Sequence, residues 1–258
     1  MTERADRAAS ASVPVRRPSA QVIVIAKEPV AGRVKTRLTP PFTPPQAALL
    51  AEAALSDTLH AVAQVADARH VLALDGVPGR WLPPGFDVIA QRGHGLDERI
   101  AAAFDEAYAG LPVPVVLVGM DTPQVTASLL ESAIRPLADG SADAVLGPAD
   151  DGGFWLLGLR QPDPMLVDGV PMSTAGTGAA QLARLEDARL RVLQLSSCTD
   201  VDDAAGALAV AAAIPGSRFA ATLRAMQRGP ALVPAVPCPV TPLGQEDPPP
   251  GAPGAPLS

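Results

Sequence analysis

Short apolar runs that alternate with helix-like segments constrain the fold of this chain more than any other feature. The clearest run is residues 21–26 (QVIVIA), which is short and β-branched, as expected of a strand buried on both faces. Similar runs predict strands at 70–74, 88–90, 113–118, 142–146, 154–159 and 191–195. Helical patterns predict helices at 43–65, 96–108, 126–137, 177–188 and 203–213. This alternation predicts an α/β fold with a mostly parallel sheet and helices on both faces.

The two ends of the chain lack this alternation. Residues 229–258 are rich in Pro and Gly, and residues 1–19 carry charges but no apolar stretch of the signal-peptide type. We therefore expect one folded domain over residues 20–228, between a disordered lead and a disordered tail. No apolar run is long enough to span a membrane, so we expect no membrane insertion. The two cysteines form no visible disulfide framework, which favours a cytoplasmic location.

The loop after the first predicted strand is basic although the chain is acidic. The formal net charge is -7, which argues against a nucleic-acid binder, yet residues 26–38 (AKEPVAGRVKTRL) contain four cations. These are Lys27, Arg33, Lys35 and Arg37. In an extended loop the last three would lie on one side, and Gly32 would let the backbone approach a ligand closely. Such a loop suits a di- or triphosphate; the alternative is an ordinary solvated loop, and no Walker A spacing is present.

Carboxylates occupy equivalent positions after other predicted strands. Asp121 follows strand 113–118 and could bind Mg²⁺ or Mn²⁺, although a turn-forming acid before a helix is the alternative. Asp150 and Asp151 precede Gly152 and Gly153. Asp-Gly is common turn chemistry, but two glycines that enter a buried strand would also allow close approach of a ligand.

Two further loops complete the set. Gln91 follows a strand and is succeeded by Gly93, and a glutamine in such a loop can read a nucleobase edge. Asp200, Asp202 and Asp203 follow the last predicted strand; they are either acids favoured by a helix dipole or a source of a second metal ligand. Ligands of open α/β sheets bind beyond the carboxyl ends of the strands, where all these loops should meet. Cations, carboxylates and a Gly-rich loop together predict a nucleotide-diphosphate site.

The motifs AKEPVAGRVKTRL, GLDERIAAAF, GMDTP and GPADDGGFWLLGL occur in the order found in the bacterial DUF2064 family, which this chain resembles over about residues 20–215. The resemblance implies a Rossmann-like GT-A fold of the nucleotide-diphospho-sugar transferase type, with a mostly parallel mixed sheet. The DUF2064 family includes the group linked to arsenosugar biosynthesis. More distantly, the pattern is similar to 2-phospholactate guanylyltransferases and to molybdopterin nucleotidyltransferases.

The resemblance also implies roles for individual residues. The nucleotide-phosphate loop would comprise Lys27, Gly32, Arg33, Lys35 and Arg37, with Gln91 and Gly93 nearby. The metal would be held by Asp121, with Asp202 as a second ligand. Asp151, Gly152 and Gly153 match the loop that would face the sugar or the acceptor, with Phe154 next to them. Apart from the resemblance, we expect Asp150 or Asp151 to be catalytic, by orienting the sugar or accepting the acceptor's proton.

Three positions depart from the family pattern. Residues 94–97 read His-Gly-Leu-Asp where the family has Gly-Asp-Leu-Gly, Phe154 replaces a tyrosine, and Asp203–Ala204 replaces a Thr-Pro pair after Asp202. These departures bear on the base-reading loop, on a hydroxyl beside the sugar and on the second metal position.

The leading hypothesis is a glycosyltransferase that depends on Mg²⁺ or Mn²⁺ and transfers a sugar from a nucleotide-sugar donor to a small-molecule acceptor. The main alternative is a nucleotidyltransferase that holds a nucleoside triphosphate in the same loop and releases pyrophosphate. The second alternative is a non-catalytic nucleotide-binding module. Cations plus a metal serve both chemistries, so the sequence leaves these alternatives open.

Overall fold

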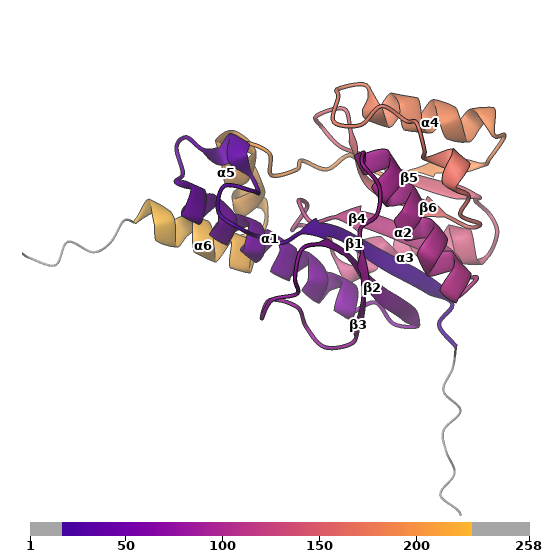
Figure 1. Cartoon of the computed structure of the whole chain (residues 1–258), viewed down its shortest axis with the longest axis horizontal. Helices are drawn as coiled ribbons and strands as arrows, with labels where there is room; N and C mark the ends of the chain where they lie inside the picture. The colour runs from indigo at the N-terminus through magenta and orange to yellow at the C-terminus, as the bar shows by residue number, and fades with distance from the viewer. Residues whose placement is uncertain (1–16, 229–258) are drawn as a thin grey trace, which may run out of the picture.

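The protein is described here by a computed structural model over residues 17–228, which contains the whole of the predicted domain (Figure 1). The disorder expected for residues 1–16 and 229–258 lies outside the described residues. One seven-stranded sheet has the order β3-β2-β1-β4-β6-β5-β7. Its strands are β1 (Ala20–Lys27), β2 (Ala68–Asp75), β3 (Phe86–Ala90), β4 (Val115–Gly119), β5 (Ala144–Pro148), β6 (Phe154–Leu159) and β7 (Val192–Gln194).

All strands run parallel except β6, which is antiparallel to both of its neighbours, β4 and β5. The loop of residues 149–153 between β5 and β6 is too short for a crossover, so the two strands form a hairpin. The start of β6 therefore lies at the same edge as the carboxyl ends of the other strands. The predicted α/β fold with a mostly parallel mixed sheet is confirmed.

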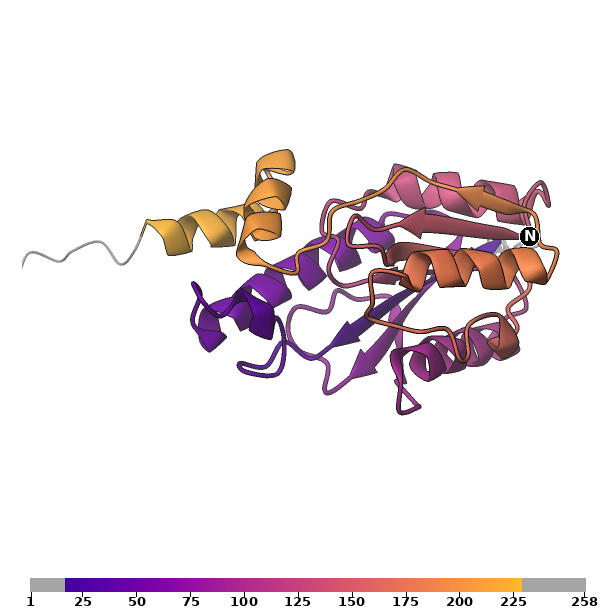
Figure 2. The ribbon, with the colours of Figure 1, turned by 90° about the horizontal axis from the view of Figure 1, so that it is seen from above.

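Helices cover both faces of the sheet. The helices are α1 (Pro44–Ala63), α2 (Leu96–Gly110), α3 (Ala127–Ala138), α4 (Thr177–Asp187), α5 (Ala204–Ala213) and α6 (Arg218–Gln227), with 3-10 turns η1 (Thr36–Leu38) and η2 (Pro164–Leu166). One core cluster joins α1 and α3 to one face, and a second joins α2 and α4 to the other. Figure 2 shows these layers from above.

A third apolar cluster lies between the first half of α1 and the pair α5 and α6, beyond the sheet (Figures 1 and 2). Leu50 and Ala54 of α1 face Phe219 and Leu223 of α6 in this cluster, while Leu55 faces the sheet. The helix is thus buried on two sides, which explains why its sequence is Ala- and Leu-rich with little amphipathic pattern. The sequence reading did not predict α6, whose position depends on α1.

Local signals define the helix ends well. Thr43 accepts a hydrogen bond from the Gln46 backbone N–H in a capping box, and two prolines fill the first turn of α1. Thr126 caps α3 and Asp203 caps α5, each through its side-chain oxygen. The sequence left two interpretations of Asp203 open, an acid at a helix end or a metal ligand. In the structure Asp203 is a helix cap. Within residues 17–228, no helix has the length and apolar character needed to cross a bilayer.

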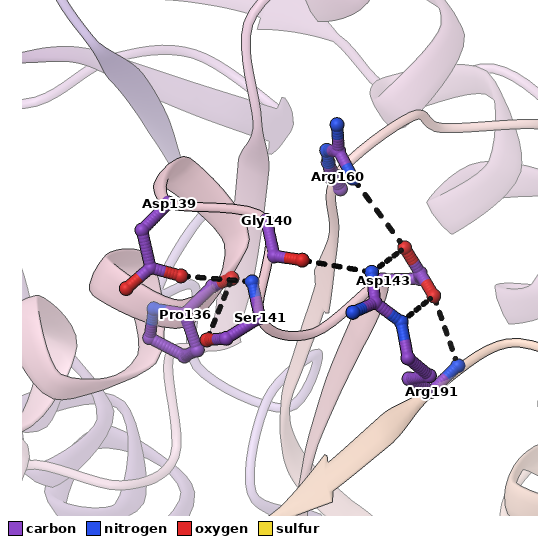
Figure 3. Close-up of polar contacts among 7 residues, drawn as sticks. All are labelled: Pro136, Asp139, Gly140, Ser141, Asp143, Arg160 and Arg191. Atoms are coloured by element: carbon purple, nitrogen blue, oxygen red, sulfur yellow. Dashed lines mark hydrogen bonds and ion pairs between the residues drawn. The ribbon is translucent and has the colours of Figure 1, made fainter.

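An ion cluster joins the amino ends of β5 and β7 to the end of β6 (Figure 3). The Asp143 carboxylate accepts hydrogen bonds from Arg191 Nε and Nη2, both at 2.8 Å, and lies 3.6 Å from Arg160 Nη1. Hydrogen bonds from Arg191 lower the pKa of Asp143 from 3.8 to about 2. Because β5 begins here, the cluster fixes the edge of the sheet opposite the 149–153 loop.

Candidate active site

A cavity of about 910 Å³ runs along the carboxyl edge of the sheet. The loops after β1, β3 and β4, the loop before β6, the segment before α4 and the segment before α5 all contribute to its walls. Ten of the predicted site residues line it: Lys27, Arg33, Lys35, Arg37, Gln91, Asp121, Asp151, Gly153, Phe154 and Asp202. Gly32, Gly93, Asp150 and Gly152 do not line it. The structure thus brings together cations and carboxylates that lie up to 175 positions apart in the sequence, from Lys27 to Asp202.

The basic loop after β1 is folded rather than extended. Turns and the 3-10 helix η1 occupy it, and the buried side chains of Val34 and Leu38 anchor it to the core. Lys35 adopts a left-handed backbone conformation (φ 50°) that turns its side chain inward, where it is 7% exposed, whereas the Arg37 side chain is 73% exposed. The expectation that Arg33, Lys35 and Arg37 share one side of an extended loop is therefore wrong.

Two of these cations bind the predicted metal ligands directly. Lys35 Nζ lies 2.8 Å from Asp121 Oδ1 and 3.4 Å from Asp202 Oδ1. Arg37 Nη1 donates to the other oxygen of Asp202 at 3.0 Å. Lys27 and Arg33, in contrast, are exposed at the cavity, and within residues 17–228 neither forms an ion pair. These last two cations are the ones left available to an anionic ligand.

Three carboxylates converge beside this pair of cations. One oxygen from each of Asp151, Asp200 and Asp202 can be chosen so that all three lie within 4.8 Å of one another. Burial, followed by the charges of Asp202 and Asp151, raises the pKa of Asp200 to about 6, against a smaller opposing effect of Lys35. The structure therefore groups Asp202 with Asp200 and Asp151, and places Asp121 against Lys35 instead.

Backbone contacts explain how the 198–202 segment reaches the site. Cys198 pairs with Ala149 at the end of β5, and the Val201 N–H donates to the Asp121 carbonyl at 3.1 Å. The side-chain amide of Gln124 donates to the Thr199 carbonyl. The segment is thus held between the 149–153 loop and the loop after β4. The Asp-rich sequence of this segment offered Asp200, Asp202 and Asp203 as candidate ligands, and the family resemblance favoured Asp202 among them.

Neighbouring acids in the 149–153 loop have different positions. Asp151 lines the cavity and accepts a 2.8 Å hydrogen bond from the Gly153 N–H. Asp150 lies outside the cavity, where it accepts a 2.6 Å hydrogen bond from Thr199 Oγ1. Hydrogen bonds from Thr199 and Ser197 lower the pKa of Asp150. Of the two predicted catalytic acids, only Asp151 faces the cavity.

The two glycines allow close packing between two loops. Gly152 has φ +89°, and a Cβ at this position would lie 2.1 Å from the Ala175 carbonyl oxygen. The Gly152 carbonyl accepts a 2.8 Å hydrogen bond from the Gly178 N–H in the first turn of α4. What approaches Gly152 is therefore the backbone before α4, and Phe154 is the member of the motif whose side chain lines the cavity.

Gln91 lines the cavity, but much of its hydrogen-bonding capacity is used within the protein. Its Nε2 donates to the carbonyls of Ala26 and Ala73 at 2.8 and 2.9 Å, which ties the ends of β1 and β2. Arg99 Nη1 lies 3.4 Å from its Oε1. The sequence reading missed Arg99, which also donates to Asp75 at 2.9 Å.

The segment of residues 172–177 is another part of the cavity wall that the sequence reading missed. Met172, Ser173, Thr174, Ala175 and Thr177 all line the cavity. The run Ser-Thr-Ala-Gly-Thr-Gly before a helix was the available signal, because small and hydroxyl-bearing residues suit a tight loop.

The mixed sheet with a charged cleft at its carboxyl edge defines a Rossmann-like protein of the nucleotide-diphospho-sugar transferase fold. The family model described as "Uncharacterized protein conserved in bacteria (DUF2064)" matches residues 49–174. Over these residues the chain is similar to the DUF2064 family, in agreement with its sequence motifs.

Among solved structures, the chain is similar to a protein from Desulfovibrio desulfuricans G20 that is provisionally named a nucleotide-diphospho-sugar transferase. The two are 28% identical with a TM-score of 0.74, over 81% of this chain and 96% of that chain. A search of curated proteins finds no match.

Two more distant structures also align. A homologue of Mycobacterium tuberculosis Rv0371c from Mycobacterium sp. strain JC1 is 18% identical (TM-score 0.49, 81% of this chain, 100% of that chain). CMP:2-keto-3-deoxy-manno-octonic acid synthetase in complex with CTP is 13% identical (TM-score 0.48, 76% of this chain, 98% of that chain). These TM-scores are too low to carry a conclusion about this chain.

Proposed function

We propose that the protein is a metal-dependent glycosyltransferase that takes a sugar from a nucleotide-sugar donor and transfers it to a small-molecule acceptor. The observation that carries this proposal is one cavity lined both by three converging carboxylates and by two cations that form no ion pair within residues 17–228. The similarity to the D. desulfuricans protein over most of both chains supports a transferase acting on nucleotide-activated sugars.

The donor diphosphate would bind to the loop after β1. Lys27 and Arg33 are exposed in the cavity and have no carboxylate partner among residues 17–228, so their charge is available to phosphate oxygens. Arg37 can reach the same ligand because its side chain is largely exposed, although it now binds Asp202. Lys35 is buried against two carboxylates, so its charge is already paired within the protein and is not available to the phosphates.

The donor set fits a hard divalent cation. Mg²⁺ and Mn²⁺ prefer oxygen ligands, and the carboxylates of Asp151, Asp200 and Asp202 converge closely enough to share one ion. Burial, followed by the charges of Asp202 and Asp151, raises the pKa of Asp200, and a cation bound beside it would favour its charged form. A bound cation would supply Lewis-acid stabilisation of the charge on the donor diphosphate.

In the proposed reaction, a lone pair of an acceptor hydroxyl forms a bond to the anomeric carbon of the donor sugar. The bond between that carbon and the diphosphate oxygen breaks, and the diphosphate leaves with the electron pair. Lys27 and Arg33 would stabilise the charge that develops on the diphosphate. Asp151 is the exposed member of the acidic group and would orient the sugar and accept the acceptor's proton.

A thermal-shift panel tests this proposal. The ligands are nucleoside diphosphates, nucleoside triphosphates and nucleotide sugars, each with and without Mn²⁺, because a ligand that binds only the native state raises the melting temperature. We expect a nucleotide sugar to give a Mn²⁺-dependent rise and then to be converted to a nucleoside diphosphate.

Other outcomes have distinct meanings. Release of pyrophosphate from a nucleoside triphosphate would replace the proposal with nucleotidyl transfer. Nucleotide binding without metal dependence or turnover would indicate a binding module. A variant Asp200→Asn that keeps the Mn²⁺-dependent rise at every concentration would refute the metal assignment.

A further inference from the structure

One side of the cavity is apolar. We define the apolar pouch by six cavity-lining side chains: Ile25, Leu96, Ile100, Leu117, Phe154 and Met172. Ile100 and Leu117 belong to the buried core under α2 and α4, and Ile25, Phe154 and Met172 pack partly buried against the same core. Leu96, at the start of α2, is 42% exposed. The hydrophobic core on this face of the sheet thus opens into the cavity.

The larger polar groups beside the pouch are engaged within the protein. Both hydrogens of the Gln91 amide are used by the carbonyls of Ala26 and Ala73. The Arg99 guanidinium is held by Asp75 at 2.9 Å and by the Gly93 carbonyl at 3.2 Å. The charge of Arg99 is therefore paired, and a ligand that used these groups would have to break contacts that fix the ends of three strands.

Two of the three hydroxyls in the 172–177 segment of the cavity wall are engaged in the same way, whereas Ser173 is exposed and, within residues 17–228, its hydroxyl forms no hydrogen bond. Thr177 Oγ1 donates to the Pro171 carbonyl at 2.8 Å and accepts from the Thr174 N–H at 3.1 Å. Thr174 Oγ1 accepts from the Gly176 N–H at 3.3 Å. Recognition of a nucleobase edge or of an anion needs donors and acceptors that are free to turn to the ligand. Apart from the Ser173 hydroxyl and the His94 ring, what this part of the cavity offers a ligand is mainly apolar surface.

We propose that the apolar pouch binds an uncharged, apolar portion of the acceptor, next to the group that receives the sugar. The identification of this ligand as the acceptor rests on the proposed function. Phe154 follows the Asp151–Gly153 turn directly, so a molecule seated against its ring lies beside the candidate proton acceptor. Lys27, the last residue of β1, and Arg33, in the loop after it, form no ion pair within residues 17–228 and are assigned to the diphosphate.

The test uses 1-butanol, 1-pentanol and 1-hexanol as neutral probes, with dissociation constants from saturation-transfer NMR titrations of the full-length protein. Burial of each added methylene should tighten binding roughly three- to fourfold. Leu96→Gln places a polar group at the mouth of the pouch and should weaken hexanol binding about threefold or more. Leu208→Gln is the matched control, because Leu208 is a leucine on α5 with a similar exposure of 49%, outside the cavity.

Three results would overturn the inference: affinity that does not depend on chain length, an equal effect of Leu96→Gln and Leu208→Gln, or displacement of hexanol by free uridine or guanosine. The last would assign the pouch to the nucleobase. Met172→Gln repeats the test at a second side chain of the pouch if Leu96→Gln proves unstable. Chain-length dependence without any response to nucleotides or nucleotide sugars would refute the proposed function alone, and the pouch would remain a site for an apolar ligand.

Discussion

The ion cluster around Asp143 makes a quantitative prediction about stability and pH (Figure 3). The pKa of the Asp143 carboxyl is lowered from 3.8 to about 2, chiefly by hydrogen bonds from Arg191. Such a lowering corresponds to at most about 2.4 kcal/mol of folding free energy. The Asp143 side chain is 26% exposed and that of Arg191 is 58% exposed, so solvent screening should reduce this to about 1 kcal/mol. We expect Asp143→Asn to lower the free energy of unfolding by about that amount at pH 7.

The sign of the pH dependence follows from the direction of the lowering. A carboxylate with a lower pKa in the folded state stabilises the protein above pH 3.8, and this contribution disappears as the pH falls towards 2. The wild type should therefore lose more stability than Asp143→Asn between pH 5 and about pH 2, and the two should then be nearly equal.

Urea unfolding at a series of pH values measures this difference. Asp105→Asn is the control, because Asp105 is exposed on α2 and, in the described part of the chain, forms no ion pair or side-chain hydrogen bond. The reasoning is refuted if both variants lose the same stability at pH 7, or if the deficit of Asp143→Asn persists unchanged at about pH 2.

Three further predictions concern the site. Gly152→Ala should destabilise the protein by about 2 kcal/mol or more in urea unfolding and lower its Mn²⁺ affinity. The reason is that Gly152 has φ +89° and that an added Cβ would lie 2.1 Å from a backbone oxygen. Gly216→Ala is the control and should be nearly neutral, because a Cβ there would have no atom within 4 Å. Asp151→Asn should lower kcat at least tenfold while Asp150→Asn changes it less than twofold, because only Asp151 faces the cavity; equal effects in steady-state kinetics would contradict this geometry. Lys35→Met should tighten Mn²⁺ binding severalfold by calorimetry, because it removes a positive charge 3.4 Å from Asp202; weaker binding in a folded variant would show that Lys35 serves the site in another way.

Local sequence was sufficient for most of the secondary structure. The predicted strand at 154–159 coincides with β6, and Thr43 and Thr126 cap α1 and α3 as their positions indicate. Periodicity and capping act within a few residues, so they can be read without a partner. The position of the site at the carboxyl edge of the sheet could also be predicted from the sequence. Loops that follow buried parallel strands meet at this edge, independently of the contacts that their side chains make. Helix α6 was missed although a local signal was present, since Ser217 caps it through a hydrogen bond from the Ala220 N–H; only its packing against α1 depends on a distant segment.

What the sequence determined by itself was the class of fold, the DUF2064 motifs and the loops that could carry charge. Only the tertiary structure decided which way each charge faces. Lys35 turns inward to Asp202, 167 positions away, while Arg37, two residues later, is exposed. Asp151 joins the acidic group while Asp150 leaves it for Thr199. These choices depend on partners distant in the chain, and the spacing of residues within one loop carries no information about such partners.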